Sequence, residues 1–239
     1  KNNWYSDPTS YEAELDKLIQ EIELKKNKFS LDEVVKSLDN ANVAYKEVKS
    51  LSKELTETEI ISRVGGGDLT RGSCSSLAFT YAGNKCGLDV LDFRDGVSRQ
   101  KFSSSSTIMN IAEKAGGVVV KHTNDFTKAN DLLKQTQVGK EYYFTCGSHV
   151  AIIRKTATGY EYLELQSPKD NGFKPLTTIV LKNRFGAKKS HTSYGTKYET
   201  KECLIDIDLL KSNPDFKKML GYINTAEDKQ KKGERGSRK

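Results

Sequence analysis

Two runs of strand-forming residues, separated by a short polar segment, constrain the fold of this chain more than any other feature. The runs are HVAIIRK at residues 149–155 and YEYLELQ at residues 160–166, with TATG between them. β-Branched and aromatic residues on both sides of a short segment that contains glycine predict a β-hairpin. The core of the protein must therefore include a sheet built around this hairpin.

The length of the TATG loop predicts which residues of the hairpin face one another. If these four residues form the loop, Lys155 pairs with Tyr160. Counting outward from this pair places His149 opposite Gln166. Glu164 then lies on the same face one diagonal away, at about 7–8 Å between Cα atoms, within reach of a long side chain. A different loop length shifts this register.

A cysteine stands at the predicted start of a helix, in the stretch DLTRGSCSSLAFTYAGNKCG at residues 68–87. The free N–H groups and the dipole at the start of a helix favour a thiolate and lower the pKa of a cysteine from about 8.5. The same N–H groups can bind the oxyanion that forms when a carbonyl is attacked. Cys74 is therefore the candidate nucleophile, and its neighbours Ser73 and Ser75 are candidate substrate-binding residues.

A nucleophilic cysteine needs a base that accepts its proton, and histidine suits this role near neutral pH. The chain has three histidines. His122 ends a predicted buried strand, His191 lies in a basic loop, and His149 follows a glycine–serine turn that can open to a cleft. His149 is therefore the candidate base, with Ser148 as a substrate-binding candidate beside it. Glu164 is placed to orient the imidazole and stabilise its charged form.

The other predicted elements mix helices and strands. Helices are predicted over residues 9–29, from Ser30 to about residue 60, and over 75–82, 103–115, 126–136 and a last segment from Pro214. Strands are predicted over residues 88–93, 118–123, 141–146 and 202–210, and residues 169–201 are predicted to be irregular. A helix that carries the cysteine, followed by antiparallel strands, is typical of an α+β domain.

The charge is distributed unevenly along the chain of 239 residues. Residues 1–60 carry nine Lys and thirteen Asp and Glu, a net charge of −4, whereas the remainder has 30 basic and 19 acidic residues, a net charge of +11. Such asymmetry is typical of separate units with different partners. The sequence therefore predicts an N-terminal helical hairpin over 1–62, a catalytic domain over 63–226 and a basic disordered tail over 227–239.

The cysteine and hydropathy patterns argue against several classes of protein. The four cysteines, at positions 74, 86, 146 and 203, form no C-x-x-C pair, and Cys146 with His149 lacks a second pair of ligands. We therefore expect no metal and no cofactor; free thiols and two disulfides both stay open. The chain has no apolar run of about 18 residues, so we expect no membrane span. It shows no signal peptide and starts with Lys1, as in a piece of a longer protein.

Taken together, GSCSSLAF, DVLDF and GSHVAIIRKTATGYEYLELQSP resemble the papain-like fold toxins of bacterial polymorphic toxin systems. The resemblance covers about residues 68–170, under half of the chain. It implies a papain-like fold, in which the helix that bears the cysteine packs on an antiparallel sheet. It also implies that Cys74 is the nucleophile, His149 the base, Glu164 the acidic orienter and Gln166 the accompanying amide.

The chain departs from the family pattern at two positions. Ser73 stands where the family commonly has asparagine, and Glu164 where it usually has aspartate. In addition, no glutamine lies a few residues upstream of Cys74 to act as the oxyanion donor. The resemblance implies a secreted or delivered hydrolase that deamidates a glutamine of, or cleaves, a target-cell protein, with a cognate immunity protein as partner. Arg94, in FRDG, either lines a substrate groove or only forms a turn.

Two other functions stay open at this stage. A chain with a net charge of +7 could be a nucleic-acid-binding or phage-structural module with inert cysteines. The region concerned is 182–201, rich in lysine and carrying Tyr194 and Tyr198, which we interpret as a solvated loop, so that nucleic acid is not an expected partner. The same three catalytic groups also serve a transglutaminase-like acyl transferase, in which an amine replaces water.

Overall fold

The protein is built around a six-stranded antiparallel sheet. The computed structural model describes residues 8–64, 72–90, 96–167 and 171–224. Within them, the strands of the sheet follow the order β3-β10-β4-β5-β6-β7. Their bounds are Val118–His122 for β3, Glu141–Cys146 for β4, His149–Lys155 for β5, Tyr160–Glu164 for β6, Gly172–Pro175 for β7 and Thr200–Asp206 for β10.

Apolar residues lie on both faces of the central strands, because successive side chains of a strand point to opposite faces. Tyr143 and Ile152 belong to one hydrophobic cluster, whereas their neighbours Tyr142 and Ile153 belong to a second. A sheet that is apolar on both faces needs a cover on each. The continuous apolar run in β5 follows from this burial.

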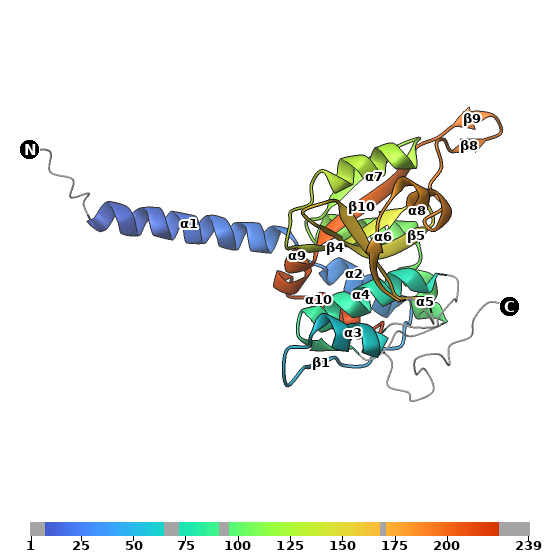
Figure 1. Ribbon diagram of the computed structural model, residues 1–239. Helices are drawn as coiled ribbons and strands as arrows, with labels where there is room; N and C mark the ends of the chain where they lie inside the picture. The colour runs from blue at the N-terminus through green and yellow to red at the C-terminus, as the bar shows by residue number, and fades with distance from the viewer. Residues whose placement is uncertain (1–7, 65–71, 91–95, 168–170, 225–239) are drawn as a thin grey trace, which may run out of the picture.

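Helices cover the two faces of the sheet (Figure 1). The face that contains Tyr142 packs against α7 (Asp125–Leu133) and α8 (Thr178–Asn183). The face that contains Tyr143 packs against the helices that supply the larger cluster, with α4 next to β5. These helices are α2 (Asp32–Asn40), α3 (Glu57–Val64), α4 (Ser73–Lys85), α5 (Val97–Phe102), α6 (Ser105–Lys114), α9 (Ile207–Ser212) and α10 (Phe216–Leu220).

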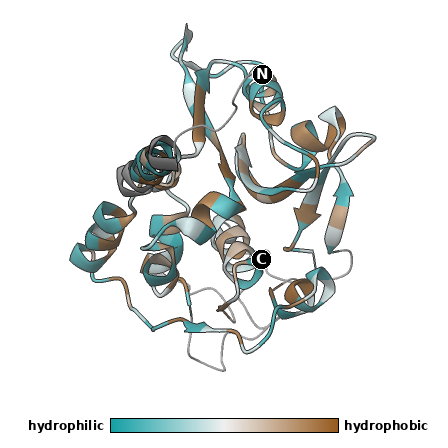
Figure 2. Cartoon of the chain, turned by 90° about the vertical axis from the view of Figure 1, so that its left-hand side faces the viewer, coloured by the Kyte–Doolittle hydropathy of each residue, from teal (hydrophilic) through white to brown (hydrophobic). Residues whose placement is uncertain are grey.

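The mixed architecture confirms the α+β class that the sequence predicts. Most helices carry both hydrophilic and hydrophobic residues, as Figure 2 shows. In the part of the chain that the structure describes, no helix combines the length and the hydropathy that crossing a membrane requires.

The N-terminal region differs from the predicted helical hairpin. Helix α1 (Pro8–Lys28) agrees with the prediction and extends away from the rest of the molecule (Figure 1). The second helix, α2, ends at Asn40 rather than near residue 60, because Asn42 takes a left-handed backbone conformation with φ +52°. Helix α3 then begins after Thr56, whose hydroxyl accepts a hydrogen bond from the backbone of Glu59, while the carboxylate of Glu59 accepts one from Thr56 N.

One hydrophobic cluster runs across the predicted boundary at residue 62. It contains Leu31 and Val34 from the N-terminal side together with Leu77 and Phe79 from the cysteine-bearing helix. Residues 29–64 therefore share a core with the helix that carries Cys74.

Other predicted elements change at their ends. The late strand stops at Asp206, because this side chain accepts a hydrogen bond from Asp208 N and starts α9. Of the strand predicted over 88–93, the described part is β2 (Leu88–Asp89), which pairs with β1 (Lys49–Ser50). The region predicted to be irregular contains β7, α8 and a small hairpin of β8 (Thr192–Ser193) and β9 (Thr196–Lys197).

Candidate active site

Cys74 lies at the start of a helix, as predicted, but α4 begins at Ser73, two residues earlier than the prediction, so that Cys74 is its second residue. The helix begins at Ser73 because Gly72 takes φ +88°, a conformation that favours glycine. A Cβ atom at this position would also come within 3.0 Å of Ser103 Cβ. The glycine therefore sets where the helix starts and brings the half-buried Cys74 to its first turn.

The surroundings of the Cys74 thiol act on its pKa in opposite directions. Burial raises the pKa, and this is the largest effect. The backbone N–H groups of Val150, Ser75 and Cys74 itself, together with the charge of Arg184, favour the thiolate but do not compensate for burial. The lowered pKa that the start of a helix predicts is thus not found in this state, and the thiol is the resting form.

A cavity of about 480 Å³ opens beside Cys74 and is also lined by His149. The wall includes two predicted substrate-binding residues, Ser75 and Ser148. A second, much smaller cavity is lined by Cys74, His149, Glu164 and Gln166 among others. The structure therefore brings all four predicted catalytic residues to adjoining hollows between α4 and the sheet.

His149 is the first residue of β5 and lies almost completely buried. The edge of its ring packs on Phe185, with 4.9 Å between ring centroids. Burial and, after it, the charge of Arg184 lower the pKa of His149 to about 3, although Glu164 acts in the opposite direction. Within the described residues no hydrogen bond reaches the imidazole, which is neutral in this state.

The predicted register of the hairpin is confirmed where the two strands pair. Lys155 pairs with Tyr160, and the pairing continues to Ile152 and Leu163. Strand β6 ends at Glu164, so Gln166 lies just beyond the paired region.

Glu164 is held by an arginine that the sequence analysis did not select. Arg184 Nε donates to Glu164 Oε2 at 2.7 Å, and Arg184 Nη2 donates to Oε1 at 3.2 Å. Burial raises the pKa of Glu164, but the hydrogen bonds and charge of Arg184 and the backbone N–H of Gln166 outweigh it and hold the pKa below its ordinary value. Glu164 is therefore ionised and paired with Arg184, not with His149 as predicted.

The contacts of Arg184 also extend to the start of α4, the helix that carries Cys74. Arg184 Nη2 donates to Gln166 Oε1 at 2.8 Å, and Gln166 Nε2 donates to Ser73 Oγ at 2.8 Å. A chain of polar contacts thus connects Glu164 through Arg184 and Gln166 to Ser73, next to the nucleophile candidate. We call these four residues the Arg184 network.

The predicted substrate-binding residues have different surroundings. Ser73 and Ser75 are buried; Ser73 accepts the bond from Gln166, and the hydroxyl of Ser75 lies 2.8 Å from that of Tyr143. Ser148 lines the larger cavity, and its hydroxyl donates to Phe185 O at 3.3 Å. The prediction for Arg94 falls outside the described residues.

All four cysteines are free thiols. Burial raises the pKa of Cys86 and of Cys203 to about 12 and raises that of Cys146 as well. In contrast to Cys74, no backbone N–H group of the described residues favours the thiolate at these three positions. Among the described residues, no group of three or more His, Cys, Asp or Glu side chains could hold a metal ion.

Sequence reasoning missed Arg184 because it lies in the region interpreted as a solvated loop. The only signal in the sequence is an arginine within a lysine-rich segment, RFGAKK at residues 184–189. Arginine forms bidentate pairs with carboxylates, which lysine does not.

A scan against protein-family models and searches of curated proteins and of solved structures find nothing that matches this chain.

Proposed function

We propose that the protein is a papain-like cysteine hydrolase that acts on amide bonds, with Cys74 as the nucleophile and His149 as the base. The observation that carries the proposal is that both residues line one cavity, with Cys74 at a helix start and His149 at the start of the neighbouring strand. The packing of α4 against β5 supports a papain-like arrangement of the cysteine helix on the sheet.

In this proposal, the reaction begins with the transfer of the Cys74 proton to an imidazole nitrogen of His149. The sulfur bonds to the carboxamide carbon, and the C–N bond breaks as the imidazolium gives its proton to the departing nitrogen. Water then hydrolyses the thioester, which yields a carboxylate and restores the thiol. The backbone N–H groups of Val150, Ser75 and Cys74, which favour the thiolate, are the donors that we assign to the oxyanion.

The first proton transfer needs a change at Glu164. Both Cys74 and His149 favour their neutral forms, because burial raises the pKa of the thiol and lowers that of the imidazole. A carboxylate next to an imidazole stabilises the imidazolium. The ion pair therefore forms when Glu164 exchanges Arg184 for His149, and the described arrangement is a resting state.

The family resemblance of the sequence motifs extends the proposal to the biological role. We propose a secreted or delivered toxin that deamidates a glutamine of, or cleaves, a protein of a target cell. A cognate immunity protein would block the cavity. This part of the proposal rests on the short motifs around Cys74 and His149.

The test is to incubate the purified protein with casein and with a panel of glutamine-containing peptides, and to follow ammonia release and peptide mass. Deamidation adds about one dalton at a glutamine, proteolysis creates a new terminus, and an added primary amine would be incorporated by an acyl transferase. We expect Cys74→Ala to abolish the reaction and His149→Ala to slow it by about 10²–10⁴-fold.

The matched control is Cys86→Ala, which removes another half-buried thiol with a raised pKa. This variant should react at the wild-type rate. A Cys74→Ala variant that retains the wild-type rate would show that the hydrolase proposal is wrong.

A further inference from the structure

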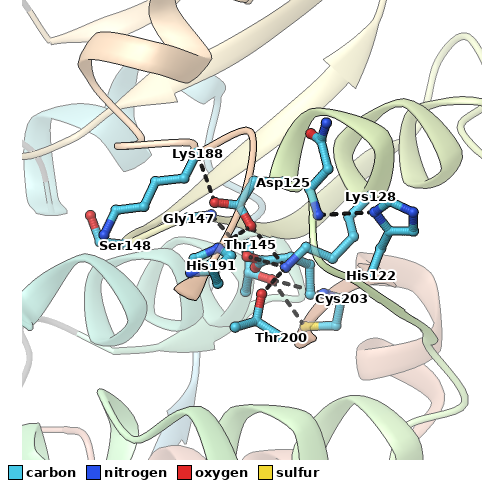
Figure 3. A network of polar contacts seen from close by, with 12 residues as sticks. His122, Asp125, Lys128, Thr145, Gly147, Ser148, Lys188, His191, Thr200 and Cys203 are labelled. Atoms are coloured by element: carbon cyan, nitrogen blue, oxygen red, sulfur yellow. Dashed lines mark hydrogen bonds and ion pairs between the residues drawn. The ribbon is translucent and has the colours of Figure 1, made fainter. Parts of the chain in front are cut away.

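A second network of polar side chains lies behind the turn that precedes His149 (Figure 3). Its centre is Lys128 on α7, whose side chain is 1% exposed. Lys128 Nζ lies 2.9 Å from Asp125 Oδ1 and 3.4 Å from Glu202 Oε1, and it donates to Thr200 Oγ1. We call Asp125, Lys128 and Glu202 the Lys128 network.

Glu202 connects this network to the cavity. It is on β10, lies almost completely buried, and lines the same 480 Å³ cavity as Cys74 and His149. Its Oε1 atom, which contacts Lys128, also accepts a hydrogen bond of 2.9 Å from Gly147 N. Gly147 takes φ +59°, and a Cβ atom there would come within 2.6 Å of Phe185 O, so the turn is tightly enclosed.

Asp125 holds the other side of the same turn through the segment that follows α8. Its Oδ2 atom accepts a hydrogen bond of 2.8 Å from Lys188 N, and its Oδ1 atom lies 2.8 Å from His191 Nε2. In the same segment, Phe185 O accepts a hydrogen bond of 2.8 Å from Ser148 N. The ring of Phe185 is the one that packs against His149.

We propose that Glu202 is a positioning residue, whose Oε1 atom holds the Gly147–Ser148 turn and thereby fixes the imidazole of His149 against the cavity. Lys128 holds Glu202, and Asp125 in turn holds Lys128. This inference rests on the proposed function, because it assigns Glu202 a role in placing the base of that reaction. A base displaced by about 1 Å can lose about 100-fold in rate.

Two conservative substitutions separate the role of Glu202 as a hydrogen-bond acceptor from the role of its negative charge. Glu202→Gln keeps an oxygen at the Oε1 position, which accepts from Gly147 and from Lys128, but loses the negative charge. Glu202→Asp keeps the charge beside Lys128 but draws the acceptor back by one methylene, out of reach of Gly147 N. Each variant retains a polar group that can contact Lys128, so both should fold.

The experiment compares three measurements on the two variants. Hydrogen exchange of the Gly147 amide reports on the turn, the NMR signals of the His149 ring report on its placement, and kcat reports on the proposed reaction. For Glu202→Gln we expect wild-type values, within about threefold in kcat. For Glu202→Asp we expect faster exchange at Gly147, shifted ring signals and a kcat about 100-fold lower with little change in KM.

The matched control is the same pair of substitutions at Glu141, a partly buried carboxylate of the same sheet, which bonds to Lys85 and Tyr81 and does not line the cavity. Neither should alter Gly147 or His149. If Glu202→Asp behaves as wild type, or if Glu202→Gln is as impaired as Glu202→Asp, the positioning role is wrong. A wild type that hydrolyses no amide, with the expected exchange at Gly147, would instead overturn the proposed function and leave the placement of His149 intact.

Discussion

The two polar networks around His149 each contain one cation that holds a carboxylate, but they differ in access to water. In the Arg184 network, the side chain of Arg184 is 35% exposed, and its partner Glu164 is 7% exposed. In the Lys128 network, the side chain of Lys128 is 1% exposed, and its partners Asp125 and Glu202 are 0% and 6% exposed. One cation can turn outward to water, whereas the other has no such alternative.

This difference assigns the networks different roles. An ion that leaves a buried partner for water recovers its hydration, so the Arg184–Glu164 pair can open at a modest cost. An ion that is buried on all sides can only lose its partners at a large cost. In the reaction that we propose, the Lys128 network therefore fixes the turn before His149, and the Arg184 network is the part of the site that can rearrange.

The largest expected effect is on stability, and it separates the two cations directly. Lys128→Met removes the shared cation of two buried carboxylates, Asp125 and Glu202, so we expect a loss of about 3–5 kcal/mol in the free energy of unfolding even though each keeps a backbone N–H donor. Arg184→Met should cost less, about 2 kcal/mol, because the side chain is partly exposed and Glu164 keeps the backbone N–H of Gln166. Urea denaturation of both variants measures the difference.

Lys140→Met is the control for these two substitutions. Lys140 also contacts two carboxylates, those of Asp206 and Asp208, but its side chain is 36% exposed. We expect a loss below about 1 kcal/mol. If Lys128→Met costs no more than Lys140→Met, the Lys128 network is not the rigid part of the site.

The next largest effect is on the free energy of unfolding at acidic pH, and it tests the burial of the His149 imidazole between the two networks. The pKa of His149 is about 3 in the folded protein and about 6.5 in an unfolded chain. Below about pH 6.5, the unfolded state therefore binds more protons than the folded state. As the pH is lowered from about 6 to 3, the free energy of unfolding should decrease by about 1.4 kcal/mol per pH unit.

His149→Gln isolates this contribution, because the variant has no imidazole to protonate. Urea denaturation between pH 6.5 and pH 5, above the range in which Glu164 titrates, should show a smaller decrease for His149→Gln than for the wild type. Equal slopes for the two proteins would mean that the ring is accessible to protons in the folded state.

Much of the sheet and part of the site could be predicted from the sequence. The hairpin of β5 and β6 has local signals, because strand-forming runs on both sides of TATG set the loop and the register. The position of Cys74 at a helix start also follows from nearby residues, since Gly72 and the serines after it determine where α4 begins. Local patterns of this kind can be recognised in the sequence without knowledge of the three-dimensional structure.

Contacts between distant segments could not be predicted in this way. Glu164 and Arg184 are separated by 20 residues, and Lys128 and Glu202 by 74. Each charge alone is typical of a solvated surface, and only the packing of α7 and α8 on the sheet buries them. For the same reason, the hairpin pattern predicts that Glu164 orients His149, its neighbour on the hairpin, whereas in the structure Arg184 holds Glu164.

The smallest expected effect is a change in the pKa of His149. It bears most directly on the comparison of the two networks, because it reports how firmly Arg184 holds Glu164. Arg184→Met removes a positive charge that lowers the pKa of His149 and frees the Glu164 carboxylate, which acts in the opposite direction. The pKa of His149 should therefore rise, although burial, the largest cause of its low value, persists. An NMR titration of the ring signals measures this change. The control is Lys182→Met, which removes an exposed cation from α8, two residues before Arg184. A His149 pKa that is the same in Arg184→Met and in Lys182→Met would show that neither the loss of the Arg184 charge nor the freed Glu164 carboxylate acts on the imidazole. The imidazolium form of His149 would then need another group to stabilise it, since no other carboxylate among the described residues acts on the pKa of this histidine.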